Sequence, residues 1–173
     1  VLHLLHDNIE LHLSIETSLS WKNLASLGVN QNVTTFHLGI LDLFADMGLS
    51  HSLIDLENPT MKYILSHFLV TSLSIGVKPV SFIYQEFKNL EKFKQWVELE
   101  KSMGFSAKGC ISPNQVAIVN KLMVDEEKEL RRAKIIVKLF EMHRDEGITG
   151  FVDEEYGFID EPIYKGALSL LKS

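Results

Sequence analysis

The chain has 173 residues, 46% of them apolar, and a formal net charge of −6. That length and composition fit a domain with a real hydrophobic core and exclude a disordered chain. Acidic and basic residues are mixed along the sequence, which excludes the concentrated basic surface of a nucleic-acid-binding protein. We therefore expect no nucleic acid partner.

Two further features bear on the compartment. No apolar run approaches the roughly 20 residues that span a bilayer, so we expect no membrane partner. A single cysteine, Cys110, excludes an internal disulfide and fits a reducing, cytoplasmic environment. The sequence begins at Val1 without an initiator Met, which leaves open a trimmed chain, a processed chain or part of a longer one.

Short apolar runs alternate with longer helical patterns along the sequence. The runs predict four strands, at 9–15, 33–39, 79–84 and 105–111. The patterns between and after them predict six helices. Four lie at 18–28, at about 59–76, at 89–103 and at 125–146; a short one runs through "DLFADMG", and another begins at Pro113 and runs through "NQVAIVNKLM". The tail holds a strand-like "ITGFV" and a last helix from Pro162.

Local signals support the helices. Asn58 before Pro59 predicts a capped helix start, and Gly147 predicts a helix end. The helix at 89–103 carries one set of residues at helical spacing: Leu90, Phe93, Trp96, Val97 and Glu100. This face indicates packing against a sheet.

Four successive strand–helix units imply a parallel sheet wrapped by helices. Two architectures remain open at this point, a doubly wound sheet and a (β/α)8 barrel, and four units are about half of a barrel that typically needs ~250 residues. In either case ligands bind at the carboxyl ends of the strands.

Acidic residues lie at three of these strand ends, namely Glu16, Asp42 and Glu86. Two carboxylates aimed at one point repel each other unless a cation lies between them, and oxygen ligands are typical of Mg²⁺. By chemistry alone, Glu16 and Asp42 are a candidate pair. The alternative is that each acid caps a helix, which is a frequent position for acids.

Four segments of the sequence resemble the citrate lyase β-subunit-like (HpcH/HpaI aldolase) family. They are "IETSLSWKNL", "LGILDLFADMGLS", "MGFSAKGCISPNQVAIVNKLM" and "YGFIDEPIYKGA", in the family's order. The resemblance implies a (β/α)8 TIM barrel, of which 1–146 would be the C-terminal part, strands five to eight. It also implies that 147–173 is an extension docking on a neighbouring subunit.

The resemblance further implies a lyase that cleaves or forms carbon–carbon bonds in 3-hydroxy acyl thioesters, such as citryl, malyl or citramalyl thioesters. Glu16 and Asp42 match the family's metal carboxylates, which hold Mg²⁺. Its substrate would be a small molecule, with a CoA or acyl-carrier thioester as one form.

Other positions carry roles by the same resemblance. Asp160 matches an acid that reaches a neighbouring subunit's site in trimeric relatives, so we expect a homotrimer with Asp160 in proton transfer; the alternative is a cap on the last helix. Thr17, Glu86 and Lys108 are candidate substrate-binding residues. For Glu86 and the nearby Tyr84, packing and support behind the site are expected rather than catalysis.

The sequence departs from the family pattern at Leu41, where the family has Glu, and at Ser112, where it has His. These replacements favour a rival interpretation, a catalytically reduced barrel protein that binds metal or ligand in a regulatory or complex-subunit role. Glu16, Asp42 and Asp160 favour the enzyme.

The histidines and the cysteine suggest no site. We expect His3, His6 and His12 to be scattered on the surface and His37 to be a satisfied interior residue. Cys110 is expected to be a buried, inert thiol.

Overall fold

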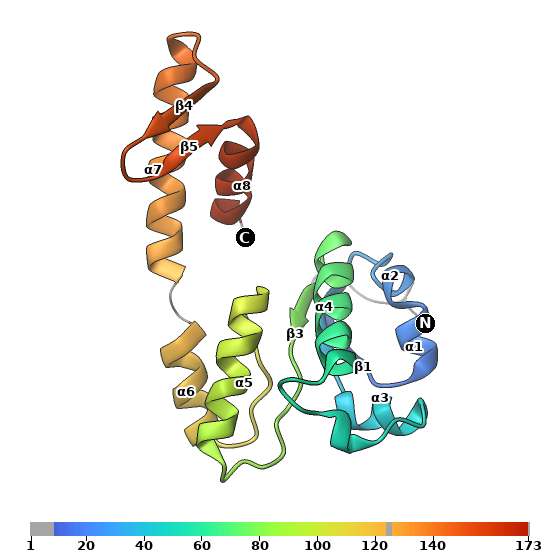
Figure 1. Cartoon of the computed structure of the whole chain (residues 1–173). Helices are drawn as coiled ribbons and strands as arrows, with labels where there is room; N and C mark the ends of the chain where they lie inside the picture. Colours follow the sequence, from blue (N-terminus) through green and yellow to red (C-terminus); the bar gives the residue numbers. More distant parts are fainter. Residues whose placement is uncertain (1–8, 124–125, 173) are drawn as a thin grey trace. The chain divides into compact units, whose positions relative to one another are not determined.

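The computed structural model describes residues 9–123 and 126–172. The chain forms two compact units, one within residues 1–123 and the other within 124–173. Figure 1 shows the helices and strands of each unit, and each unit has its own hydrophobic core. Among the described residues, no helix is both long and apolar enough to cross a lipid bilayer.

A parallel sheet forms the centre of the first unit. Its strands β1 (Leu11–Ile15), β2 (Val33–Leu38) and β3 (Lys78–Val80) are adjacent in chain order, as the alternating pattern predicted. Ile15 pairs with Leu38, and His37 pairs with Val80. The unit is therefore an α/β structure whose strand ends share one edge.

The fourth predicted strand, 105–111, is reduced to one parallel bridge between Ser81 and Lys108. Two backbone hydrogen bonds make it, Ser81 N to Ala107 O at 3.0 Å and Gly109 N to Ser81 O at 3.1 Å. The Lys108 side chain turns into the core beside this bridge, where its Nζ donates a hydrogen bond to the Phe82 carbonyl. The expectation of a full strand was wrong.

The helices of the first unit match the predicted ranges closely. They are α1 (Ser18–Lys22), α2 (Leu24–Leu27), α3 (Ile40–Asp46), a 3-10 turn η2 (His51–Leu53), α4 (Pro59–Ser74), α5 (Leu90–Met103) and α6 (Pro113–Met123). The Asn58 side chain accepts bonds from the Thr60 and Met61 N–H groups, which confirms the predicted cap before Pro59. Gly104 ends α5 in a left-handed conformation, φ 108°.

One face of the sheet is buried and the other is partly open. Ile15, Phe36 and Leu38 belong to the main core together with Leu65 and Phe68 of α4. Residues on the opposite face of β1, His12 and Ser14, are exposed. A strand points successive side chains to opposite faces, so the polar face of the sheet is the one without helix cover.

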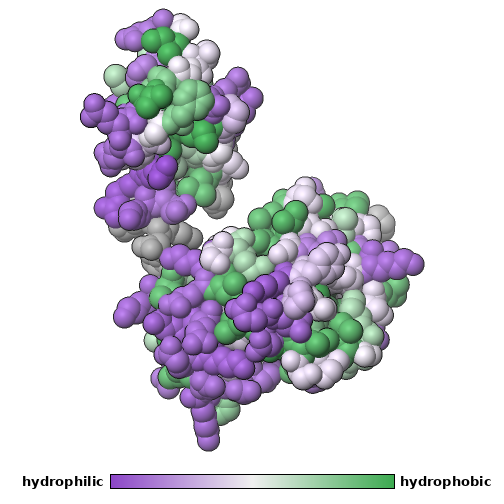
Figure 2. Space-filling view, viewed as in Figure 1, coloured by the Kyte–Doolittle hydropathy of each residue, from purple (hydrophilic) through white to green (hydrophobic). Residues whose placement is uncertain are grey.

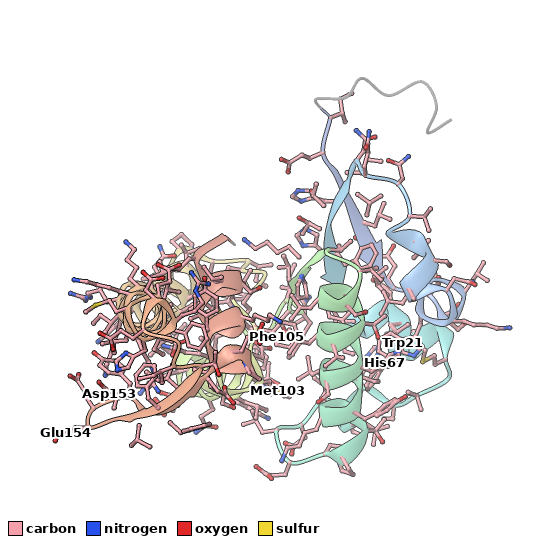
Figure 3. The ribbon with its side chains drawn as sticks, turned by 90° about the horizontal axis from the view of Figure 1, so that it is seen from above. Trp21, His67, Met103, Phe105, Asp153 and Glu154 are labelled. Atoms are coloured by element: carbon pink, nitrogen blue, oxygen red, sulfur yellow. The ribbon has the colours of Figure 1, made fainter. Side chains whose placement is uncertain are left out.

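Contacts between aromatic rings help to pack the helices around this core. Figure 3 shows Trp21 of α1 beside His67 of α4, and their ring centroids are 5.0 Å apart. Phe105, which follows α5, is buried and stacks on Phe68 at 6.4 Å. Trp96 is fully buried and meets the Phe82 ring edge-on at 5.0 Å. The visible surface of each unit mixes polar and apolar side chains (Figure 2).

The second unit pairs two helices with a hairpin. It comprises α7 (Glu126–Asp145), β4 (Gly150–Asp153), β5 (Gly157–Asp160) and α8 (Glu161–Lys172). The strands are antiparallel, and β5 was not expected from the sequence. Gly147, at φ 83°, follows α7 as predicted.

The boundary between the units falls after Met123, whereas we expected the barrel part to run to residue 146. The reason is packing: Ala133, Ile136 and Phe140 of α7 form one core with Ile159 of β5 and Ala167 of α8. Helix α7 therefore belongs with the tail.

Candidate functional site

The strand ends of the first unit frame a cavity of about 220 Å³. Glu16 follows the last residue of β1, and Asp42 lies in the first turn of α3, which begins two residues after β2. Both line this cavity, together with Ser14, His37, Leu38, Gly39, Ile40, Leu41, Ser81, Ile83, Gln85 and Gly109. The structure therefore brings the two predicted metal carboxylates to one edge of the sheet.

Neither acid occupies the cap position of a helix, although Asp42 lies in the first turn of α3, where the helix dipole favours a negative charge. Thr17 is the cap of α1 and forms a capping box with Ser20. The cap position of α3 is Gly39, without a side chain. The carboxylate that binds the first turn of α1 belongs to Asp46, whose Oδ2 accepts hydrogen bonds from the N–H and the hydroxyl of Ser18. These bonds lower the pKa of Asp46.

Gly39 matters for the position of Glu16. A Cβ at Gly39 would lie 2.7 Å from the Glu16 Cβ and 3.1 Å from its Oε2. Real Cβ atoms do not approach so closely, so any larger residue would displace the Glu16 side chain. The missing Cβ thus leaves room for a carboxylate at this strand end.

Two of the three candidate substrate-binding residues form hydrogen bonds within the protein. The Thr17 hydroxyl accepts from the Ser20 N–H at 3.1 Å, so it is engaged in the helix cap. Glu86 accepts a 2.9 Å hydrogen bond from the Tyr84 hydroxyl and lines a different cavity, formed by residues 85–89. Burial, the bond to Glu86 and the charge of that carboxylate raise the pKa of Tyr84 to about 12.

Lys108, the third candidate, is buried away from solvent. Its Nζ lies 2.6 Å from the Glu100 Oε1 and donates a 2.9 Å hydrogen bond to the Phe82 carbonyl. Ser81 donates to the same Glu100 oxygen at 2.7 Å, and both charged side chains have zero exposure. A direct contact with substrate would require Lys108 to leave this pair, so the structure gives it a core position instead.

Glu100 was visible in the sequence as the one charged residue at the apolar spacing of its helix, although no role was assigned to it. Burial raises the pKa of the Glu100 carboxyl, and the Lys108 charge opposes that shift. Burial likewise lowers the pKa of Lys108 against the Glu100 charge. Glu100 Oε2 has no hydrogen-bond partner.

The remaining predicted residues are spread out. Asp160, in the second unit, accepts a hydrogen bond from the Ile163 N–H at 3.1 Å, which is the helix-cap alternative. Cys110 is half-buried, and burial raises the pKa of its thiol. His3 and His6 lie outside the described residues.

The imidazole rings of His12 and His37, by contrast, are in contact. His12 Nδ1 and His37 Nε2 are 3.3 Å apart. Sequence reasoning missed this pair, although both residues lie on one face of neighbouring strands. Across residues 9–123 and 126–172, no group of three or more His, Cys, Asp or Glu side chains could hold a metal ion by itself.

Comparison with known proteins shows which family the chain matches. The model of the HpcH/HpaI aldolase/citrate lyase family matches residues 4–113. The chain is 25% identical over 109 residues to the mitochondrial citramalyl-CoA lyase of Rattus norvegicus, covering 63% of this chain and 32% of the relative. It is 24% identical over 116 residues to citrate lyase subunit beta of Leuconostoc mesenteroides, covering 67% and 38%.

Solved structures agree on the fold. The CitE protein of Mycobacterium tuberculosis, in complex with magnesium, acetoacetate and coenzyme A, matches with a TM-score of 0.69 at 19% identity, over 96% of this chain and 61% of that one. A citrate lyase of Burkholderia xenovorans matches with a TM-score of 0.79 at 12% identity, over 97% and 53%. The chain thus spans about a third of the curated relatives' length. It belongs to the HpcH/HpaI aldolase/citrate lyase family.

Proposed function

We propose that this chain is part of an Mg²⁺-dependent carbon–carbon lyase acting on a 3-hydroxy acyl thioester. One observation carries the proposal: in a member of this family, Glu16 and Asp42 line one cavity at the carboxyl ends of neighbouring parallel strands. Relatives are named citramalyl-CoA lyase and citrate lyase subunit beta, which supports this reaction class. The first unit would correspond to strands five to eight of a (β/α)8 barrel.

The residues present fit Mg²⁺. This ion prefers carboxylate and water oxygens and usually takes one or two protein carboxylates, with substrate and water filling the other positions. Two exposed carboxylates with the space that Gly39 leaves are such a donor set. Bound there, the ion would supply Lewis-acid polarisation of a substrate oxygen.

The chain's own contribution is positional. Thr17 fixes the start of α1 directly after Glu16, and Gly39 fixes the turn before Asp42, so both acids come from the ends of a rigid sheet. We propose that Thr17, an exposed residue directly after Glu16, contacts substrate. Glu86, held by Tyr84, would support the neighbouring strand end. Lys108 would act behind the cavity by fixing the Phe82 carbonyl.

Calorimetry with Mg²⁺ tests the metal site. Binding should be lost in Glu16→Gln and in Asp42→Asn, and kept in the matched variant Glu57→Gln, whose exposed carboxylate pairs with Lys62. Equal binding by all four proteins would refute the assignment.

We further propose that the protein is a homotrimer in which the second unit docks on a neighbouring subunit and brings Asp160 to its site. Light scattering on the full chain and on a chain ending at Met123 tests the assembly, because the second unit has its own core. Mixing inactive Glu16→Gln and Asp160→Asn proteins should restore activity if the two residues act across subunits. Activity that survives in Asp160→Asn alone would refute the shared site.

A second function is favoured by Leu41, which lines the cavity where the family pattern has Glu. In that case the protein binds metal and ligand in a regulatory or complex-subunit role without cleavage. Incubation with citramalyl-, malyl- and citryl-CoA plus Mg²⁺ separates the two: cleavage supports the lyase, and tight binding without cleavage supports the regulator.

A further inference from the structure

The open face of the sheet carries a pair of imidazoles with no assigned role. His12 of β1 stands opposite Thr35, and His37 of β2 stands opposite Ser14, so the two histidines are diagonal neighbours on adjacent parallel strands. The side chain of His12 is 52% exposed, and His37 lines the cavity that also holds Glu16 and Asp42. The pair is therefore accessible from solvent and lies beside the proposed carboxylate site.

The distance between the two nitrogens is the first argument for a shared ligand. His12 Nδ1 and His37 Nε2 are 3.3 Å apart and hydrogen-bonded to each other, so one nitrogen donates and the other accepts, and the stacked ring planes are inclined by 29°. Two nitrogens bound at about 2.0–2.1 Å to one tetrahedral Zn²⁺ would themselves be about 3.3 Å apart. A shared ion would replace this hydrogen bond: the ring that donates it would carry its proton on the other nitrogen, and the half-exposed His12 ring would turn so that both lone pairs face the ion.

The surroundings of His12 are the second argument. The Glu10 Oε2 lies 3.8 Å from His12 Nε2, the nitrogen that faces away from His37, and it accepts a 3.2 Å hydrogen bond from Thr34. At 3.8 Å this carboxylate is beyond hydrogen-bond distance, but its charge favours the proton on Nε2, which leaves the Nδ1 lone pair for a ligand. Metal-binding histidines usually have such a carboxylate on their other nitrogen.

The charge state of His37 is consistent with a ligand role. Burial lowers the pKa of His37, and the neighbouring His12 lowers it further, so both effects favour the neutral ring. A neutral imidazole is the form that binds metal.

We propose that His12 and His37 bind one borderline transition-metal ion, for which Zn²⁺ is the probe, at a site separate from the Mg²⁺ carboxylates. Nitrogen donors select Zn²⁺, Ni²⁺ and Cu²⁺ over Mg²⁺, which prefers oxygen. Water completes the coordination, since no third His, Cys, Asp or Glu joins the pair among the described residues.

The test is a Zn²⁺ titration of the full chain by calorimetry in excess Mg²⁺, which occupies oxygen-donor sites. One equivalent should bind, and His12→Ala and His37→Ala should each weaken it at least tenfold. The matched control is His67→Ala, because His67 stacks on Tyr63 and has no part in the pair. Figure 3 shows it beside Trp21, whose ring is tilted against it. Circular dichroism confirms that each variant is folded.

Three outcomes would overturn the proposal. The first is no Zn²⁺ binding by the parent chain. The second is unchanged affinity in either single variant. The third is loss of binding in a His3→Ala/His6→Ala double variant with the pair intact. Glu16→Gln should leave Zn²⁺ binding unchanged, so failure of this site and failure of the Mg²⁺ site are distinguishable.

Discussion

Replacing Lys108 by Met should destabilise the first unit severely. The side chains of Lys108 and Glu100 have zero exposure, and Lys108 Nζ lies 2.6 Å from Glu100 Oε1. Removing one partner of a buried pair leaves an uncompensated charge and typically costs about 3–5 kcal/mol. With a urea slope of about 2 kcal/mol per molar, the unfolding midpoint should fall by about 2 M.

Fluorescence of Trp96 provides the assay, since this residue is fully buried against Phe82, whose carbonyl Lys108 holds. The matched control is Lys94→Met on α5, the helix that also carries Trp96 and Glu100. Lys94 pairs with Glu98 at 3.6 Å on the exposed face, and such pairs contribute less than about 1 kcal/mol.

The effect should depend on pH. Without Lys108, burial holds the folded-state pKa of Glu100 above its ordinary value of 4.5. The folded variant then binds more protons than the unfolded chain between those two pKa values, so its stability rises as pH falls through the folded-state pKa toward 4.5. The slope is about 1.4 kcal/mol per pH unit in that window.

A double variant, Glu100→Leu with Lys108→Met, should recover stability relative to Lys108→Met, because it leaves no buried charge. The reasoning is refuted if Lys108→Met costs no more than Lys94→Met, or if the double variant is less stable than Lys108→Met.

Three further predictions concern single positions. Gly39→Ala should weaken Mg²⁺ binding in calorimetry, because its Cβ would displace Glu16; unchanged affinity would contradict this. The pKa of Asp46 should lie below its ordinary value of 3.8 in an NMR pH titration, and Ser18→Ala should raise that pKa. The bonds from Ser18 therefore stabilise the folded state above pH 3.8, and this stabilisation is lost as the pH falls through the lowered pKa. Gly147→Ala should destabilise the second unit by about 1–2 kcal/mol in thermal unfolding, because φ is 83° there; no change in melting temperature would count against it.

Local sequence signals determined much of the fold. The Asn58–Pro59 start, the glycine after α7 and the alternation of apolar runs with helical patterns correspond to real helix ends and to three parallel strands. These features depend on neighbours within a few residues, so a linear sequence displays them. The placement of Glu16 and Asp42 at one edge followed from the same alternation, because parallel strands end together.

Tertiary structure decided which side chains have partners. The sequence offered Lys108 as a site residue, yet Glu100 and the Phe82 carbonyl hold its side chain in the core, and the predicted fourth strand is reduced to one bridge. The division of the chain after Met123 likewise follows from the packing of α7 on α8 and β5.

The histidine pair shows the physical reason for the difference. His12 and His37 are 25 residues apart, and their 3.3 Å contact exists only in the register that sets β1 against β2. Propensity and spacing act along the chain, whereas hydrogen bonds, ion pairs and ligand sites depend on distances across it. The sequence therefore determined most helices, three parallel strands and the edge where the acids lie, and the packed structure decided which polar groups meet.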